Sequence, residues 1–257
     1  MTVARGGAGL HHYSALFYRY QREGSARSAA EVLPLLQAQL PLQSVLDVGC
    51  GAGAWLAAHQ RLGVKDVLGV DGDYVDRTLL MVQPQHFQAQ DITQKFDLGR
   101  TFDLVQCLEV AEHIAPKASP LLVDNLVRHG RYVLFSAAVP GQGGEDHINE
   151  QVYEYWRDLF AERGYRLFDY LRQNIAGRSN IEPWYRFNLL LFVHDAQISE
   201  LNPHLKATRV SDNARIADFS PPGYRLRKAL LRHFPTATVT ALARWKHQRA
   251  VSAFARR

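Results

Sequence analysis

Two carboxylates frame a glycine-rich loop near residue 50, and their spacing indicates a site for a nucleoside. Residues 44–56 read SVLDVGCGAGAWL, in which an apolar run leads into Asp47 and then into Gly49 and Gly51. Glycine lets the chain turn tightly and lets a ligand approach the backbone. Asp71 ends the next apolar run, where a carboxylate can accept hydrogen bonds from both hydroxyls of a ribose. Because Asp47 would repel a pyrophosphate, the pattern favours a ligand that carries a positive charge.

The glycine loop alone also leaves a dinucleotide site open. Gly49, Gly51 and Ala54 match the pattern GxGxxA, which is typical of dinucleotide-binding folds. A NAD-linked dehydrogenase is therefore the alternative at this point.

Two further polar segments carry side chains that can move a proton. EVAEHI covers residues 109–114, and SAAVPGQGGEDHINEQ covers residues 136–151. Each follows an apolar run that reads as a buried strand, and ligands of open α/β sheets bind at the carboxyl ends of the strands. Histidine suits proton removal because its ordinary pKa lies near neutral pH. We predict His113, His147 and Glu109 as the catalytic residues.

The elements that must position these residues form an α/β pattern. Short apolar runs alternate with helical patterns, which is typical of a mostly parallel sheet with crossover helices. The predicted strands are residues 44–48, 67–71, 87–90, 102–108, 131–137, 165–171 and 187–194. Only about 15 residues separate the last two strands, which favours an antiparallel pair at the sheet edge.

The chain divides into three predicted parts. Residues 1–40 are expected to form an N-terminal helical cap or lid, with Ser28 and Glu31 as a capping box. Residues 41–194 form the ligand-binding domain, and residues 195–257 form a basic helical extension.

Composition excludes several classes of protein. Apolar residues are 47% and charged residues 21% of the 257 residues, which argues against a disordered or fibrous chain. The apolar runs fall far short of the ~18 residues that a membrane-spanning helix needs, and the N-terminus lacks the apolar core of a signal peptide. Two cysteines are too few for a disulfide framework. We expect a cytoplasmic protein, with peripheral membrane contact as an option.

Four motifs together resemble those of the class I S-adenosylmethionine (SAM)-dependent methyltransferases. They are LDVGCGAG, LGVDG, QDIT and FDLVQCLEVAEHI, which begin at residues 46, 68, 90 and 102. The resemblance covers roughly residues 40–193. It implies a Rossmann-like seven-stranded sheet in the order 3-2-1-4-5-7-6 with strand 7 antiparallel, and SAM as the cofactor.

The resemblance also implies roles for single residues in cofactor binding. Gly49 and Gly51 would lie under the methionine part of SAM, with Asp47 orienting their loop. The remaining assignments are Asp71 on the ribose with Gly72 beside it, Asp91 on the adenine amine, Ile92 against the adenine ring and Leu108 near the methionine part.

The sequence says less about the molecule that would accept the methyl group. The motifs resemble a bacterial branch that acts in glycan and secondary-metabolite pathways, which implies a small-molecule or sugar acceptor, methylated at oxygen. Nitrogen of a secondary metabolite is an alternative, as is a binding module without catalysis. We expect the pocket walls to be the glycine-rich loop, residues 184–188 and the N-terminal aromatic residues Tyr13, Phe17, Tyr18 and Tyr20.

The pattern ExxEH formed by Glu109, Glu112 and His113, followed by a later histidine, supports a further alternative. It resembles the metal-binding pattern of small-RNA 2′-O-methyltransferases and of some quinone-pathway O-methyltransferases. A divalent ion there could lower the pKa of an acceptor hydroxyl. Metal-free relatives carry the same string, so no residue is assigned as a metal ligand, and an RNA methyltransferase stays an alternative.

Charge is unevenly distributed along the chain. Residues 195–257 carry 12 Lys and Arg against 4 Asp and Glu, and the nine basic residues after Gly223 are accompanied by no acidic one. Such a segment predicts contact with an anionic surface, either a membrane or a polyanion. The alternative is a solvated pair of terminal helices that packs through Leu226, Leu230, Leu231 and Phe234.

Overall fold

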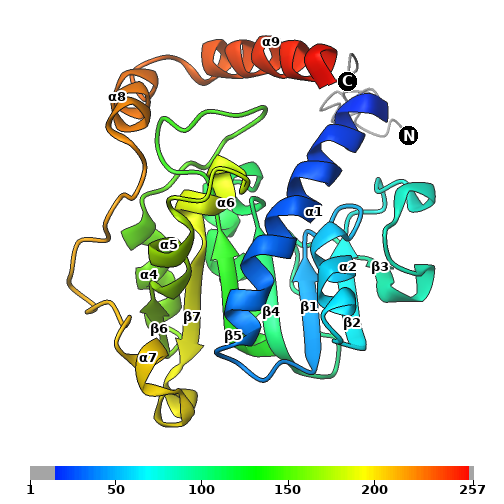
Figure 1. The fold of residues 1–257 in the computed structure, drawn as a ribbon, viewed down its shortest axis with the longest axis vertical. Coiled ribbons are helices and arrows are strands. Elements are labelled where there is room, and N and C mark those ends of the chain that lie inside the picture. The colour runs from blue at the N-terminus through cyan, green and yellow to red at the C-terminus, as the bar shows by residue number, and fades with distance from the viewer. Residues whose placement is uncertain (1–14, 255–257) are drawn as a thin grey trace, which may run out of the picture.

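The computed structural model describes residues 15–254, with side chains throughout that range except for residues 15–21, 236, 246–248 and 250–254. Its centre is one seven-stranded sheet in the order β3-β2-β1-β4-β5-β7-β6 (Figure 1). The strands are β1 (Ser44–Val48), β2 (Asp66–Asp71), β3 (Phe87–Ala89), β4 (Phe102–Leu108), β5 (Gly130–Ser136), β6 (Tyr165–Phe168) and β7 (Leu190–His194). Strand β7 runs antiparallel to both neighbours, and the other pairs are parallel. The predicted fold and strand order are confirmed.

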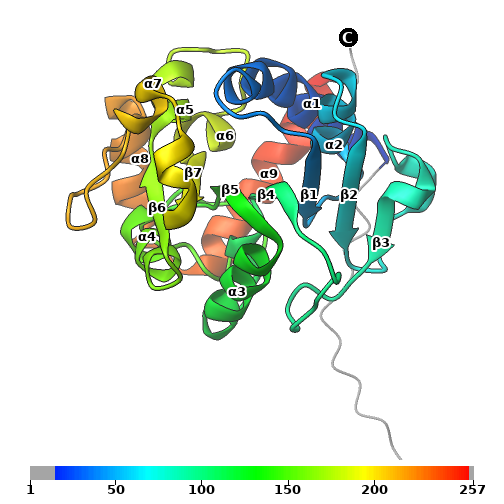
Figure 2. The same ribbon diagram turned by 90° about the horizontal axis from the view of Figure 1, so that it is seen from below.

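Helices cover both faces of the sheet (Figure 2). On one face lie α1 (Ala15–Gln37), α2 (Ala54–Arg61), α5 (Tyr170–Ile175) and α6 (Pro183–Asn188). On the other face lie α3 (Ser119–His129) and α4 (Tyr153–Ala161). Alternate residues of the central strands point to opposite faces, so Val45 and Leu104 join the first core and Leu46 and Val105 the second.

The last two predicted strands were too long, because short helices take up part of each apolar run. Strand β6 stops at Phe168, and α5 begins at Tyr170, next to a buried ion pair in which Arg172 Nη2 lies 2.6 Å from Asp169 Oδ2. Pro183 opens α6, which takes residues 187 and 188 from the predicted strand. A short apolar run has no periodicity long enough to separate strand from helix.

The capping box predicted at Ser28 and Glu31 is wrong. Ser28 lies inside α1, where its hydroxyl donates to the Gly24 carbonyl at 2.8 Å and accepts from the Glu182 amide at 3.0 Å. A serine can bond back to the preceding turn in this way within a helix. The inner face of α1 is buried in the core through Ala29, Val32, Leu33 and Leu36.

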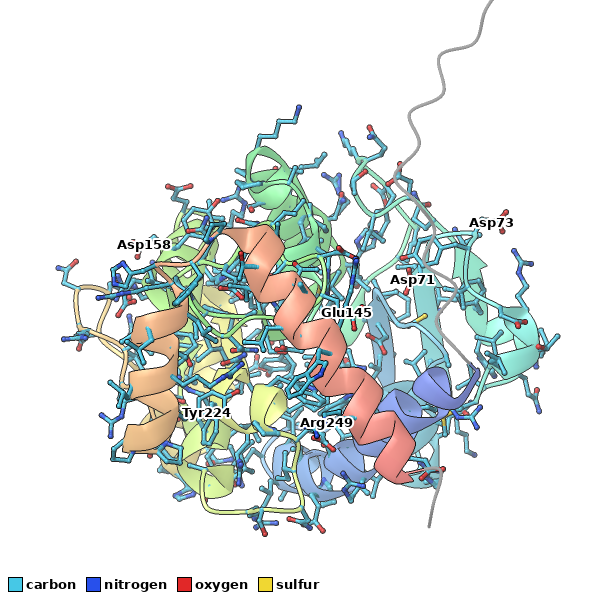
Figure 3. All side chains as sticks on the ribbon, turned by 90° about the horizontal axis from the view of Figure 1, so that it is seen from above. Asp71, Asp73, Glu145, Asp158, Tyr224 and Arg249 are labelled. Carbon is cyan, nitrogen blue, oxygen red and sulfur yellow. The ribbon has the colours of Figure 1, made fainter. Side chains whose placement is uncertain are left out.

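The C-terminal extension returns to the top of the sheet. It contains α7 (Pro203–Lys206), α8 (Pro222–Leu231) and α9 (Thr236–Phe254). Helix α9 passes over the carboxyl ends of the strands toward α1 (Figures 1 and 3). None of the helices in the described range is both long and apolar enough to cross a bilayer.

Two glycines in the loop after β5 pack closely against the C-terminal extension. Gly141 and Gly143 have φ of +80° and +71°. A Cβ on Gly141 would lie 2.0 Å from the Lys228 carbonyl oxygen, and one on Gly143 would lie 2.8 Å from a Val239 methyl carbon. Glycine is therefore required here both for the backbone conformation and for the close approach of α8 and α9.

Candidate active site

A cavity of about 690 Å³ opens at the carboxyl edges of β1, β2 and β4. Of the residues predicted from the sequence, seven line it: Gly49, Asp71, Gly72, Asp91, Ile92, Glu109 and His113. Asp47, Gly51, Leu108 and His147 lie outside this lining. The volume is in the range of small-molecule sites in proteins.

The glycine loop is held with its backbone toward the cavity. The Gly49 amide donates to the Val70 carbonyl at 2.8 Å, and its φ is +81°. A Cβ at Gly49 would lie 2.4 Å from a methyl carbon of Val110. Any larger residue would displace Val110, which itself lines the cavity.

Asp71 joins the glycine loop to the following turn. Its Oδ2 accepts from the Gly51 amide at 2.7 Å, and its Oδ1 accepts from the Gly72 amide at 2.7 Å and the Tyr74 hydroxyl at 2.6 Å. The carboxylate thus already holds one hydroxyl at the cavity wall. Sequence reasoning missed Tyr74, whose hydroxyl stands where a ligand hydroxyl would compete for Asp71.

Asp47 lies beneath the loop and is almost completely buried. Burial raises the pKa of its carboxyl group to about 7, while a hydrogen bond with Gln106 opposes the rise and the charge of Asp71 adds to it. The Gln106 amide oxygen in turn lies 3.1 Å from Nε2 of the buried His59. Leu108, predicted near the ligand, is buried in the core at the end of β4.

Asp91 and Ile92 form the far end of the cavity. One carboxylate oxygen of Asp91 accepts from the Thr93 amide at 2.9 Å and from the Thr93 hydroxyl at 2.6 Å. These contacts fix the turn after β3. Ile92 is buried and offers an apolar surface to the cavity.

Glu109 follows β4 in a left-handed conformation, with φ of +56°. Such a backbone is costly for a residue with a Cβ and is concentrated at functional sites. Asn188 and Gln142 reach its two carboxylate oxygens with their side-chain amides at 3.4 Å each. Burial raises the pKa of Glu109 to about 7. Burial beside Glu109 also raises the pKa of Glu112 well above its ordinary value.

His113 and His147 meet beside these two acids. Their ring centroids are 5.0 Å apart, and the rings are nearly perpendicular. Nδ1 of His147 lies 2.9 Å from Glu150 Oε1, and Nδ1 of His113 lies 3.3 Å from the Asp146 carbonyl oxygen. Desolvation and the neighbouring His147 lower the pKa of His113. The structure therefore brings the three predicted catalytic residues to one sheet edge.

Glu150 was missed by the sequence analysis although it organises this loop. Its Oε2 accepts from the Gly141 amide and its Oε1 from the Gly143 amide, each at 2.8 Å, and Oε1 also faces His147. The spacing of three residues between His147 and Glu150 was the available signal. Gln142 and Asn188 were also missed as partners of Glu109, since Asn188 comes from α6, far along the chain.

Three side chains at this edge lie close enough together to be candidate metal ligands. The ligand atoms offered by Glu112, His113 and His147 all lie within 4.8 Å of one another. Glu112 Oε2 is buried and has no hydrogen-bond partner among the described residues. Carboxylate and imidazole together are ligands that divalent transition metals accept.

Parts of the chain are similar to known proteins. Residues 18–173 match the family described as "Methyltransferase domain". The chain is 32% identical over 147 residues to the ubiquinone biosynthesis O-methyltransferase of Albidiferax ferrireducens, a match that covers 50% of this chain and 57% of that protein. It is 37% identical over 120 residues to nodulation protein S of Rhizobium tropici, which covers 42% and 49%. The chain spans about half the length of the curated relatives it matches.

Solved structures share the fold at low sequence identity. A SAM-bound amino pentose methyltransferase from Micromonospora echinaspora has a TM-score of 0.51 and 17% identity, over 73% of this chain and all of that one. A sugar N-methyltransferase from a Streptoalloteichus species has a TM-score of 0.50 and 20% identity, over 76% and 99%. Because the family match covers more than half of its length, the chain belongs to the methyltransferase domain family, and its strand order and these structures show the fold of the class I SAM-dependent methyltransferases.

Proposed function

We propose that this enzyme transfers the methyl group of SAM to a hydroxyl oxygen of a small molecule or a sugar. The observation that carries the proposal is the pairing of His147 with Glu150 beside Glu109 and His113. A histidine that is oriented by a carboxylate is a recurrent arrangement for taking a proton from a hydroxyl. The named activity of the Albidiferax relative, an O-methyltransferase, supports the same choice of atom.

The residues around the cavity fit the cofactor. Asp71 already accepts a hydroxyl, the Gly49 turn leaves no room for a side chain, and Ile92 offers an apolar wall. When bound, SAM supplies a methyl group already activated by a sulfonium. The protein therefore has two remaining tasks, which are to align the acceptor and to take its proton.

His147 is the proposed proton acceptor. With Nδ1 donating to Glu150, Nε2 keeps a free electron pair. As the methyl group leaves sulfur, which becomes a neutral thioether, and bonds to the acceptor oxygen, the O–H bond would break and the proton would move to Nε2. The negative charge of Glu150 then stabilises the imidazolium ion.

Glu109, Gln142 and Asn188 are the proposed positioning residues for the acceptor. Their side chains form one polar cluster, in which the Asn188 amide donates to Gln142 Oε1 at 2.9 Å. Glu109, whose backbone is left-handed, lines the cavity together with His113. Such a cluster can hold an acceptor hydroxyl in place by hydrogen bonds.

A metal-assisted form of the same reaction is the second candidate. The metal-assisted form is favoured by the buried Glu112 oxygen that has no hydrogen-bond partner among the described residues and that lies near His113 and His147. Glu112, His113 and His147 would hold the ion, which would lower the pKa of the acceptor hydroxyl. This form would also suit a ribose hydroxyl of RNA as acceptor.

The test uses SAM with an isotopically labelled methyl group and a panel of phenols, sugars and matching amines, with mass spectrometry to locate the label. His147→Ala should lower turnover on hydroxyl acceptors by about two to four orders of magnitude. His204→Ala is the matched control, because this exposed histidine lies in α7 at the opposite end of the molecule (Figure 1). Label transfer to amines alone, or full turnover by His147→Ala, would refute an oxygen acceptor with His147 as its base.

Chelation separates the two candidates. If a metal ion assists, chelator should abolish activity, and Glu112→Gln should remove both activity and the heat of binding of Mg²⁺ or Mn²⁺. Under the metal-free proposal, chelator leaves turnover unchanged, and Glu112→Gln retains most of it.

A further inference from the structure

Helix α8 presents two leucines to solvent and its lysine to the protein. Lys228 is buried, and its ammonium group lies 2.7 Å from Asp218 Oδ2. Leu226 and Leu230, one helical turn apart, are 62% and 58% exposed. A helix that only packs on its own domain would show the opposite arrangement.

The two leucines belong to a larger exposed surface. Seven of the nine large apolar side chains that are exposed in the described part of the chain lie on α8, on α9, or on the segments beside them. These seven are Leu226, Leu230, Phe234, Leu242, Trp245, Ile148 and Val152. Single exposed apolar residues are ordinary, but a group of this kind marks an interaction site.

Three hollows along this surface have lining residues in common. Ile148 lines both the hollow of about 250 Å³ beside Phe234 and that of about 550 Å³ beside Trp245. Arg232 lines the first of these and also a hollow of about 690 Å³ that reaches Val152. Ile148, Phe234, Trp245 and Val152 therefore lie along connected hollows.

Positive charge accompanies the apolar groups. Arg225 is exposed on α8 and Arg232 is exposed just after it, where both line the hollow that reaches Val152, and the Arg249 guanidinium lies 4.5 Å from the ring centroid of Trp245. The sequence after Asp218 contains no acidic residue. We define the C-terminal face as the exposed side chains Leu226, Leu230, Phe234, Leu242, Trp245, Arg225, Arg232 and Arg249.

We propose that the C-terminal face docks on the surface of a bilayer that contains anionic lipids. Leucine and phenylalanine can enter the boundary between headgroups and acyl chains, arginine can pair with lipid phosphates, and tryptophan favours the interface between them. A nucleic acid would satisfy the arginines but leave the leucines in water. The bilayer is therefore the occupant that satisfies both kinds of side chain.

Docking would also orient the enzyme. Helix α9 crosses above the carboxyl ends of the strands, where the candidate active site lies (Figure 3). The bilayer would lie on that side of the molecule. The docking proposal does not depend on which acceptor is methylated, because the C-terminal face contains none of the proposed catalytic residues.

The test is flotation of the full chain with two kinds of vesicle, one of phosphatidylcholine alone and one with equal parts of phosphatidylcholine and phosphatidylglycerol. We expect binding to the anionic vesicles that weakens as salt is added. Arg225→Ala with Arg232→Ala should weaken binding about 25-fold, at about fivefold for each arginine. Leu226→Glu and Leu230→Glu should each weaken it about tenfold or more.

The matched control is Arg61→Ala with Leu62→Glu, since these exposed residues lie at the end of α2, away from the C-terminal face. It should bind vesicles like the unchanged protein. An unchanged melting temperature will show that each variant is folded. Binding of the leucine variants at full strength, or retention of the protein by heparin but not by anionic vesicles, would overturn the proposal. Light scattering that shows a dimer dissociated by Leu226→Glu, without vesicle binding, would assign the face to a second copy and equally overturn it.

Discussion

Replacing Asp47 by asparagine should stabilise the protein at alkaline pH while weakening its hold on the cofactor. The carboxyl group is buried beneath the glycine loop, and burial raises its pKa from 3.8 to about 7. The folded protein therefore keeps this proton up to about pH 7, whereas the unfolded chain loses it near pH 3.8. The contribution of Asp47 to the free energy of unfolding is greatest below the unfolded pKa and falls as the pH rises toward 7.

The magnitude follows from the size of this shift. Each pKa unit corresponds to about 1.4 kcal/mol, so a rise of about three units removes about 4 kcal/mol of stability between about pH 4 and pH 8. Asparagine has nearly the same shape and cannot ionise. Asp47→Asn should thus match the wild-type protein near pH 4 and exceed its free energy of unfolding by about 4 kcal/mol near pH 8.

The assay is urea unfolding across this pH range without cofactor, followed by calorimetric titration with SAM. A cationic cofactor favours the ionised carboxyl group, so SAM affinity should rise with pH in the wild type but not in Asp47→Asn. Asp73→Asn is the control, because Asp73 lines the same cavity but its side chain is 84% exposed. If Asp47→Asn has a lower free energy of unfolding than the wild type at pH 8, burial of the Asp47 carboxyl group does not determine how stability depends on pH.

Three other substitutions test separate parts of the structure. Asp71→Ala should weaken SAM binding by about 1.5–3 kcal/mol in a calorimetric titration, the range for a hydrogen bond to a charged group; unchanged affinity would remove Asp71 from the site. Glu150→Gln should lower kcat on a hydroxyl acceptor by about 10- to 100-fold with SAM affinity retained, whereas Glu154→Gln, which removes a carboxylate that accepts from the Ile216 amide, should leave kcat near wild type. Equal kcat values for these two variants would contradict the role given to Glu150. Phe135→Ala should cost about 3–5 kcal/mol in urea unfolding, since this ring is fully buried against Trp156 and Phe160; a loss below 1 kcal/mol would mean that the core refills the cavity.

The sheet and the glycine loop could be predicted because both rest on local patterns. The strand order follows the family motifs, and the positions of Asp47, Gly49 and Asp71 follow from the ends of their strands. The sequence could not show that Asp71 also holds the Tyr74 hydroxyl, because a turn two residues away brings that side chain back. Patterns of this kind describe where a residue is placed along an element, not which partners it meets.

The catalytic edge was predictable only in part for the same reason. His113 and His147 were expected to meet because both follow parallel strands. Asn188 reaches Glu109 from 79 positions further along the chain, at the end of a helix whose last two residues the sequence pattern had assigned to a strand. In α8, composition indicated basic charge, but only packing reveals that Lys228 turns inward and Leu226 outward.

The close contact of Gly141 and Gly143 with α8 and α9 means that the C-terminal extension is not a detachable module. The carboxylate of Glu150 accepts from both glycine amides and also contacts His147. The loop that contacts the extension and the proposed proton acceptor are therefore held by the same side chain. Removing the extension would expose the loop of Gly141 and Gly143 to solvent, and it would also make the position of His147 less fixed. Insertions, fusions or exchanges of this segment between relatives should therefore alter turnover even where the rest of the active site is kept intact.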